Sequence, residues 1–247
     1  MAKISLGMVS STVSTVSTMT KEQFTQQLST IVGKGKRIKF MNAIVGTLSD
    51  PSKMPCYSYS IPAKHCQTGS KLRLVKGSTC SDCYAMKGRY PFPNVQNAMN
   101  TRFDSLGNLD LWQAVMIELI KETYSGSGTS FDKKYFRWHD SGDLQSVPHL
   151  QAIANIATAL PDILFWLPTR EYPMVSYYLK NNNKPENLTI RLSAHMIGKA
   201  IDRPMPNTTT SSVESGNGYT CPASKQANTC QDCRACWHVN NVDYVQH

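Results

Sequence analysis

The chain has 247 residues, of which 40% are hydrophobic, and it carries a formal net charge of +9 with a pI near 9.1. This length allows one large domain or two small ones with a real core. No apolar run approaches the roughly 20 residues of a membrane-spanning helix, which argues against a membrane protein. The basic charge favours an anionic partner, with a nucleic acid or a nucleotide as the first candidate.

The N-terminal residues lack the apolar core of a secretory signal, because Ser and Thr interrupt their apolar positions. We therefore expect a cytoplasmic protein whose cysteines are reduced thiols or metal ligands. Residues 1–19 are predicted to form a flexible N-terminal tail. Residues 20–247 are predicted to form a single α/β domain, with cysteine-rich irregular segments at about 51–93 and 204–240.

The first half of that domain has clear helix signals and one strand signal. A capping box at Thr20-Lys-Glu-Gln23 predicts a helix over about 21–32, and a strand is predicted at 38–45. Residues 46–93 contain five prolines and four cysteines, and their irregular character indicates a functional segment. Further helices are predicted at 94–103 and after Asn108, before a flexible break at Ser125–Ser130.

The second half alternates strands and helices. Strands are predicted at 135–139, 163–167 and 188–192, separated by helices after Pro148 and at 172–179. This alternation is typical of right-handed βαβ units and a parallel sheet. Together with the strand at 38–45 it fits an open sheet or a partial (β/α) barrel-like parallel sheet, and we favour the barrel-like form. Residues 204–220 are predicted to be a loop.

Polar side chains follow each of these three strands, where parallel α/β folds place their sites. A histidine beside carboxylates can move protons or bind a metal, and an arginine can bind a phosphate or carboxylate. The same residues can also serve as caps and structural ion pairs. The candidate catalytic residues are His139, Asp140 and Asp143, and the candidate substrate-binding residues are Thr169, Arg170 and His195.

The strongest chemical signal is a C-terminal cysteine group. Cys221 is followed by Cys230, Cys233 and Cys236 in a Cys-x2-Cys-x2-Cys run. Such spacing turns successive thiolates toward one point and is typical of zinc or iron–sulfur ligation, whereas cysteines two residues apart form only strained or redox-active disulfides. Trp237 is predicted to shield this cluster from water.

A second group is formed by Cys56, Cys66, Cys80 and Cys83, with Tyr84 predicted to shield it. Three arrangements remain open. Cys66, Cys80 and Cys83 can form a three-thiolate site with an open fourth position, or all four cysteines can close around a metal. Alternatively, cysteines from both groups hold one cluster. Cys56 is the weakest of these candidates.

Several motifs together resemble a bacteriophage family, the "gene product eighty-eight" proteins. They are Lys53-Met-Pro-Cys-Tyr-Ser58, the run from Cys80-Ser-Asp-Cys-Tyr to Tyr90, Arg137-Trp-His-Asp-Ser-Gly-Asp143, Phe165-Trp-Leu-Pro-Thr-Arg170, and the segment from Cys221-Pro-Ala to Trp237. The resemblance covers about residues 40–237 and implies a phage protein that works in the host bacterial cytoplasm. It implies no settled activity. Cys56 stands where relatives are expected to have another residue.

A more distant similarity is to radical S-adenosylmethionine enzymes, which combine a partial (β/α) barrel with an open three-cysteine cluster and often an auxiliary four-cysteine cluster. Two features depart from that pattern. The usual motif is Cys-x3-Cys-x2-Cys, and Cys66 lies too far before Cys80. No Gly-Gly-Glu-like segment follows the first strand, so S-adenosylmethionine is a cofactor without motif support.

Three functional hypotheses follow. The first is an iron–sulfur protein with one or two 4Fe–4S clusters, acting as a redox or radical-type enzyme on a nucleic acid or nucleotide. The second is a zinc-stapled protein that binds nucleic acid or a host partner without chemistry of its own. The third is a nuclease that uses His139, Asp140 and Asp143 with a divalent metal.

Overall fold

The computed structural model describes residues 19–125, 132 and 134–245. The predicted tail and the predicted break after Ser125 lie almost entirely outside these residues. Within them, no helix has both the length and the apolar character required to cross a bilayer.

The α-helices are α2 (Lys21–Thr30), α3 (Lys34–Val45), α4 (Gln67–Leu72), α5 (Pro93–Ser105), α6 (Leu109–Tyr124), α7 (Val147–Ala159), α8 (Tyr172–Asn181) and α9 (Ala235–His238). The strands are β1 (Ser58–Tyr59), β2 (Tyr135–Trp138), β3 (Leu164–Thr169), β4 (Leu188–Ser193), β5 (Thr209–Val213), β6 (Tyr219–Thr220) and β7 (Asn241–Tyr244).

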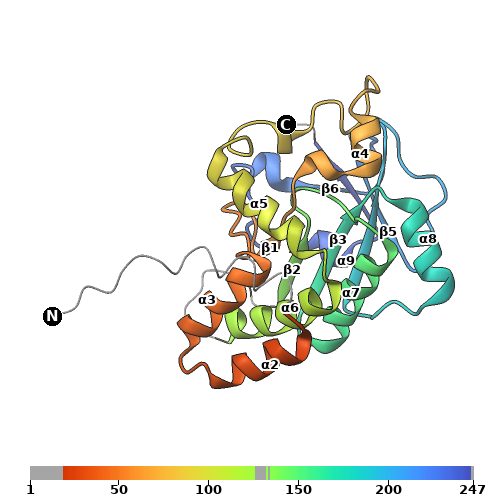
Figure 1. Cartoon of the computed structure of the whole chain (residues 1–247). Helices are drawn as coiled ribbons and strands as arrows, with labels where there is room; N and C mark the ends of the chain where they lie inside the picture. Colours follow the sequence, from red (N-terminus) through yellow and green to blue (C-terminus); the bar gives the residue numbers. More distant parts are fainter. Residues whose placement is uncertain (1–18, 126–131, 133, 246–247) are drawn as a thin grey trace.

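The seven strands form one sheet in the order β1-β2-β3-β4-β5-β7-β6, and every pairing is parallel. Because β1 to β5 are neighbours in chain order, right-handed crossovers bring their helices to the same face. α6 and α7 lie in front of the sheet in Figure 1, whereas α9 lies behind it. The predicted parallel α/β sheet is thus confirmed. Among the described residues, no pairing joins β1 to β6, so barrel closure is not seen.

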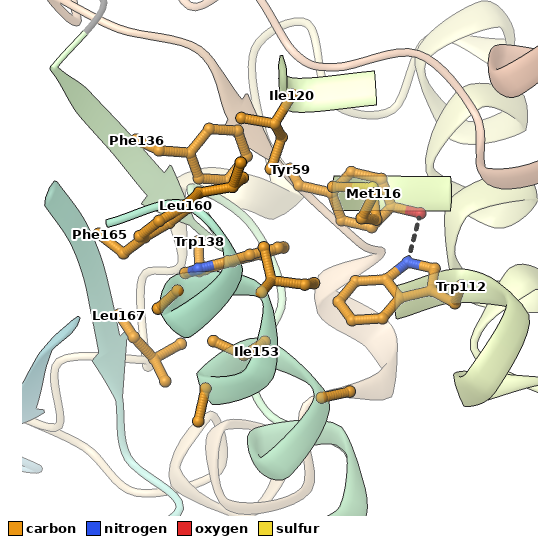
Figure 2. Packing of buried hydrophobic residues seen from close by; sticks show 14 of the residues in the cluster. Tyr59, Trp112, Met116, Ile120, Phe136, Trp138, Ile153, Leu160, Phe165 and Leu167 are labelled. Atoms are coloured by element: carbon orange, nitrogen blue, oxygen red, sulfur yellow. Dashed lines mark hydrogen bonds between the residues drawn. The ribbon is translucent and has the colours of Figure 1, made fainter. Parts of the chain in front are cut away.

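The helix-covered face of the sheet is apolar. Alternate strand residues point toward the helices, including Phe136, Trp138, Phe165 and Leu167, all of which are fully buried. Figure 2 shows these side chains interleaved with those of α6 and α7. The indole Nε1 of Trp112 donates to the hydroxyl of Tyr59 at 3.2 Å (Figure 2), so the buried polar atoms are satisfied at the same time.

The opposite face carries the remaining alternate residues, including Tyr135, Arg137, Trp166 and Arg191. α9 covers this face, and Trp237 of α9 packs edge-to-face on Trp166 with the ring centroids 5.2 Å apart. The Trp237 indole Nε1 also donates to the backbone carbonyl of Phe136 at 3.1 Å. The C-terminal cysteine segment is therefore attached to the sheet itself.

The predicted strand at 38–45 is wrong, because residues 34–45 form α3. Its buried residues Met41, Ile44 and Val45 follow helical spacing, which outweighs the strand propensity of the segment. The edge of the sheet is instead β1, two residues inside the segment predicted to be irregular. The predicted loop at 204–220 likewise contains β5 and β6, whose Ser and Thr residues give no apolar alternation.

Candidate functional site

The carboxyl ends of β2 and β3 are joined by one buried carboxylate. Asp143 accepts hydrogen bonds from Thr169 Oγ1 at 2.5 Å, from the backbone N–H of Arg170 at 2.9 Å and from the backbone N–H of Leu144 at 2.8 Å. Burial raises the pKa of Asp143 to about 6, although these hydrogen bonds favour its charged form. Asp143 and Thr169 thus meet at the predicted edge, and their contacts hold two strand ends together.

A long connection crosses this edge, and we call residues 60–92 the rim segment. Its Thr68 donates from its backbone N–H and its hydroxyl to the Glu171 carboxylate, at 2.8 and 2.7 Å. Arg170 Nε donates to Thr79 Oγ1 at 3.0 Å, and Thr79 Oγ1 donates to the backbone carbonyl of Ala194 at 3.0 Å. The rim segment is therefore fixed to the ends of β3 and β4.

His195, the last of the predicted rim residues, stacks on Tyr172 with the ring centroids 4.5 Å apart. Its backbone carbonyl accepts a hydrogen bond from the Thr79 N–H at 2.9 Å. His195 therefore lies beside Arg170 and Thr79, as a shared substrate-binding edge requires.

The three predicted catalytic residues have different surroundings. His139 has a φ of 55° and its ring lies 5.3 Å from that of His149, inside the protein. Burial, followed by the charge of Arg137, lowers the pKa of His139 to about 3. Asp140 instead accepts from Ser58 Oγ at 2.6 Å and from the Tyr90 hydroxyl at 3.3 Å. Each of the three side chains thus has its own partners, and their joint role in a metal-dependent nuclease stays a prediction.

Three cysteines of the rim segment gather beside Asp143. A methyl group at Gly69 would lie 3.6 Å from Cys80 Sγ and 3.7 Å from Cys66 Sγ, so both thiols border the same glycine. Burial raises the pKa of the Cys66 thiol, and the nearby Asp143 and Cys83 raise it further. Burial and Cys83 also raise the pKa of Cys80, against the opposing charge of Arg170.

The four C-terminal cysteines form a second group. Burial raises the pKa of Cys230 to about 11, with added repulsion from Cys236, Cys221 and Cys233. Hydroxyls border the group, because Tyr244 Oη lies 3.3 Å from Cys236 Sγ and Tyr219 Oη lies 3.7 Å from Cys233 Sγ.

Cys56 comes before the rim segment in the chain and lies next to the C-terminal group, because it shares a packed cluster with Cys236 and the charge of Cys230 acts on its thiol. It is fully buried against Trp166 and Trp237. Burial raises the pKa of its thiol to about 12. Its position is that of a small apolar core residue.

Two arginines at the C-terminal group were not predicted from the sequence. Arg191 is fully buried and donates to the backbone carbonyls of Thr210, Cys236 and Val239. The Arg137 guanidinium lies 4.5 Å from the ring centroid of Trp166. Among the described residues, neither arginine is within 4.0 Å of a carboxylate. The sequence feature that could have identified Arg137 and Arg191 is a charged residue in the middle of an otherwise apolar strand.

The charges of these arginines act on the cysteines. Burial raises the pKa of Cys236, and both Arg191 and Arg137 oppose that rise. Trp237 is buried next to Cys236, as the predicted shielding role requires. Tyr84 is 59% exposed and donates from its hydroxyl to the backbone carbonyl of Asp140, and its shielding of the rim cysteines stays a prediction.

All eight cysteines are free thiols. Within the described part of the chain, no three His, Cys, Asp or Glu side chains are arranged to hold a metal ion. The donor set nevertheless suits a soft metal, because each group offers three or four thiols. Metal ligation by the predicted cysteines stays a prediction.

Comparison with curated proteins and with solved structures gave no match. A family model, described as Gene product 88, matches residues 19–239. This range covers most of the chain and includes both cysteine groups, the rim segment and every strand of the sheet except β7. The chain therefore belongs to the Gene product 88 family.

Proposed function

We propose that this protein is an iron–sulfur protein in which Cys221, Cys230, Cys233 and Cys236 hold a 4Fe–4S cluster. The observation that carries the proposal is the pair of arginines on the opposite face. Arg137 and Arg191 place positive charge against Cys236, with no carboxylate at ion-pair distance in the described residues. Buried charges require compensation, and cluster-bound thiolates would supply it.

The spacing of the ligands favours a cluster over zinc. Structural zinc sites commonly use paired Cys-x2-Cys turns, whereas a Cys-x2-Cys-x2-Cys run is typical of cluster ligation. Arg191 would hold the segment through the carbonyl of Cys236. Trp237 would keep water from the same side, because it is buried against the sheet.

The rim cysteines are proposed as a second, three-thiolate site. Cys66, Cys80 and Cys83 lie beside Asp143, and Arg170 is close enough to affect Cys80. When bound there, a cluster would supply one-electron chemistry or an open coordination position. Thr79 would orient Arg170 through its hydroxyl, and Arg170 would bind an anionic group such as a phosphate. The proposed substrate is thus a nucleotide or a nucleic acid, within the host bacterium.

The test is purification without oxygen, followed by a visible absorption spectrum and by iron, sulfide and zinc analysis of the same sample. A brown protein with about four irons per chain indicates one cluster, and about eight irons indicates two. A colourless protein with stoichiometric zinc and no sulfide would overturn the proposal in favour of a zinc-stabilised protein.

Cysteine variants then assign the ligands. Cys233→Ala is expected to remove the C-terminal cluster and to leave the rim site intact. Cys80→Ala is expected to remove the rim site and to leave the C-terminal cluster intact. Cys56→Ala is the matched control, because Cys56 is a buried cysteine packed against Trp166 and Trp237. Its iron content is expected to equal that of the wild type. Loss of iron in Cys56→Ala would contradict the ligand assignment.

A further inference from the structure

Positive charge is concentrated in the rim segment. Residues 60–92 contain six basic residues and one acidic residue, so they carry +5 of the net charge of +9. Five of the six basic side chains are exposed: Lys64, Lys71, Lys76, Lys87 and Arg89. The single acidic residue, Asp82, pairs with Lys87. This surface therefore attracts polyanions far more strongly than the protein average suggests.

The same segment exposes most of the large apolar side chains at the surface. Eight such side chains are exposed among the described residues, and five of them lie between residues 74 and 92: Leu74, Val75, Tyr84, Met86 and Phe92. Phe92 is 55% exposed, and the ring centroids of Tyr84 and Tyr90 are 5.9 Å apart. Isolated exposed apolar residues are ordinary, but a group of this kind marks a binding surface.

Successive backbone turns hold this part of the segment in place. The N–H of Lys87 donates to the carbonyl of Tyr84, that of Tyr90 to Lys87, and that of Phe92 to Arg89, at 3.1 to 3.2 Å. The Tyr84 hydroxyl donates to the carbonyl of Asp140 at the end of β2. The aromatic and basic side chains are therefore displayed directly beside Cys83 and the carboxyl edge of the sheet.

We propose that the rim segment binds single-stranded nucleic acid, with bases stacked on Phe92 and Tyr84 and the phosphates held by Arg89 and the neighbouring lysines. Exposed rings next to basic residues are the surface that unpaired bases recognise, because every base has a face that can stack. In a duplex those faces are covered. The inference deepens the proposed function by naming the substrate class, and in that respect it rests on it.

The test is fluorescence anisotropy with a labelled 20-nucleotide oligo-dT, its RNA counterpart and a duplex of the same length. The single strands are expected to bind with an affinity that falls steeply with salt, by about 0.7 log units per log unit of salt for each phosphate contact. Equal affinity for the duplex, or no binding at low salt, would overturn the proposal.

Variants locate the contact. Phe92→Ala is expected to weaken single-strand binding about tenfold, and Phe92→Trp to retain it, because the loss of a stacked ring costs roughly 1–3 kcal/mol per base. Arg89→Ala is expected to lower the salt slope by about 0.7. Tyr177→Ala is the matched control, since Tyr177 is 61% exposed and belongs to α8, which is not part of the rim segment. Equal losses in Tyr177→Ala and Phe92→Ala would contradict the assignment.

Metal analysis of the same samples separates the two proposals. If the protein contains iron but does not bind the oligonucleotides, the rim-segment proposal is overturned and the iron–sulfur proposal stands. If it binds the oligonucleotides but contains no iron, the iron–sulfur proposal is overturned and the rim-segment proposal stands. If only an isolated mononucleotide binds, the rim segment is not the single-strand surface proposed here.

Discussion

The two faces of the sheet are built on different principles. The helix-covered face is filled with interleaved aromatic and aliphatic side chains, and the Tyr59 hydroxyl buried there has partners. The opposite face holds a fully buried Arg191 and a half-buried Arg137 beside thiols, and it is covered by short elements rather than by long helices. Charge and thiols stand on the second face where apolar side chains would otherwise pack, which indicates a functional region.

The largest expected effect comes from breaking the helix-covered face. Trp138 is fully buried and contacts Trp112, Phe136 and Phe165. Trp138→Ala is expected to lower the free energy of unfolding by about 4 kcal/mol, through lost burial and the cavity that remains. Urea unfolding followed by circular dichroism measures this change. Tyr177→Ala, an exposed aromatic control, is expected to change stability by less than about 0.5 kcal/mol.

On the opposite face, the free energy of unfolding should depend on the buried guanidinium of Arg191. Arg191→Met removes a fully buried guanidinium and the donors to three backbone carbonyls, so a loss of about 3 kcal/mol is expected. Arg37→Met is the control, because Arg37 forms a partly exposed pair with Glu122 that contributes about 0–1 kcal/mol. Equal stabilities of the two variants in urea unfolding would show that the guanidinium is not what holds the cysteine segment.

A smaller effect is expected where the helix-covered face ends, at His139. In the unfolded chain a histidine gains a proton near pH 6.5, but in the folded protein His139 does so only near pH 3. The unfolded state therefore binds more protons between these values, and the contribution of His139 to stability falls as the pH falls. Asp143 has the opposite effect, because folding raises its pKa from 3.8 to about 6. Between these values the folded state binds more protons, so the contribution of Asp143 to stability rises as the pH falls.

His139→Asn isolates this contribution, because asparagine tolerates the positive φ of 55°. The variant is expected to be less stable than the wild type at pH 7 and to lose that deficit as the pH falls from 6.5 toward 3. Unfolding free energies of both proteins across this range provide the measurement. A deficit that does not vary with pH would mean that His139 is protonated alike in the folded and unfolded states.

The contrast between the faces also explains what could be predicted from the sequence. β2, β3 and β4 and their helices were predicted because apolar periodicity records burial on the helix-covered face. β5 and β7 were missed because their polar residues are buried through hydrogen bonds, such as Ser212 with Asp243, that leave no apolar pattern. The Cys spacing groups Cys56 with the rim cysteines, but Cys56 lies beside Cys230 and Cys236. The roles of Arg137 and Arg191 depend on which face of the sheet each residue occupies.

At the carboxyl edge of the sheet, too, the sequence predicts some residues of the candidate site and not their partners. The ends of the strands correctly predicted that Asp143, Thr169, Arg170 and His195 share one edge. The partners that fix this edge, Thr68 and Thr79, come from the rim segment and lie about 90 to 100 positions earlier in the chain. No local pattern encodes contacts of this kind, nor does one show that His139 is buried and has a positive φ.

The smallest effect tests whether the space beside the rim thiols is under constraint. Gly35 and Gly69 are both helical, but a methyl group at Gly35 meets nothing within 4 Å, whereas one at Gly69 lies 3.0 Å from Cys66 Cβ. Gly35→Ala is expected to raise stability by about 0.5–1 kcal/mol. Gly69→Ala should forfeit that gain and also lower the iron retained at the rim site, because the methyl group intrudes beside two thiols. Equal gains in unfolding free energy with unchanged iron would mean that the thiols move aside freely, and the three-cysteine site would then lack the fixed geometry that ligation requires.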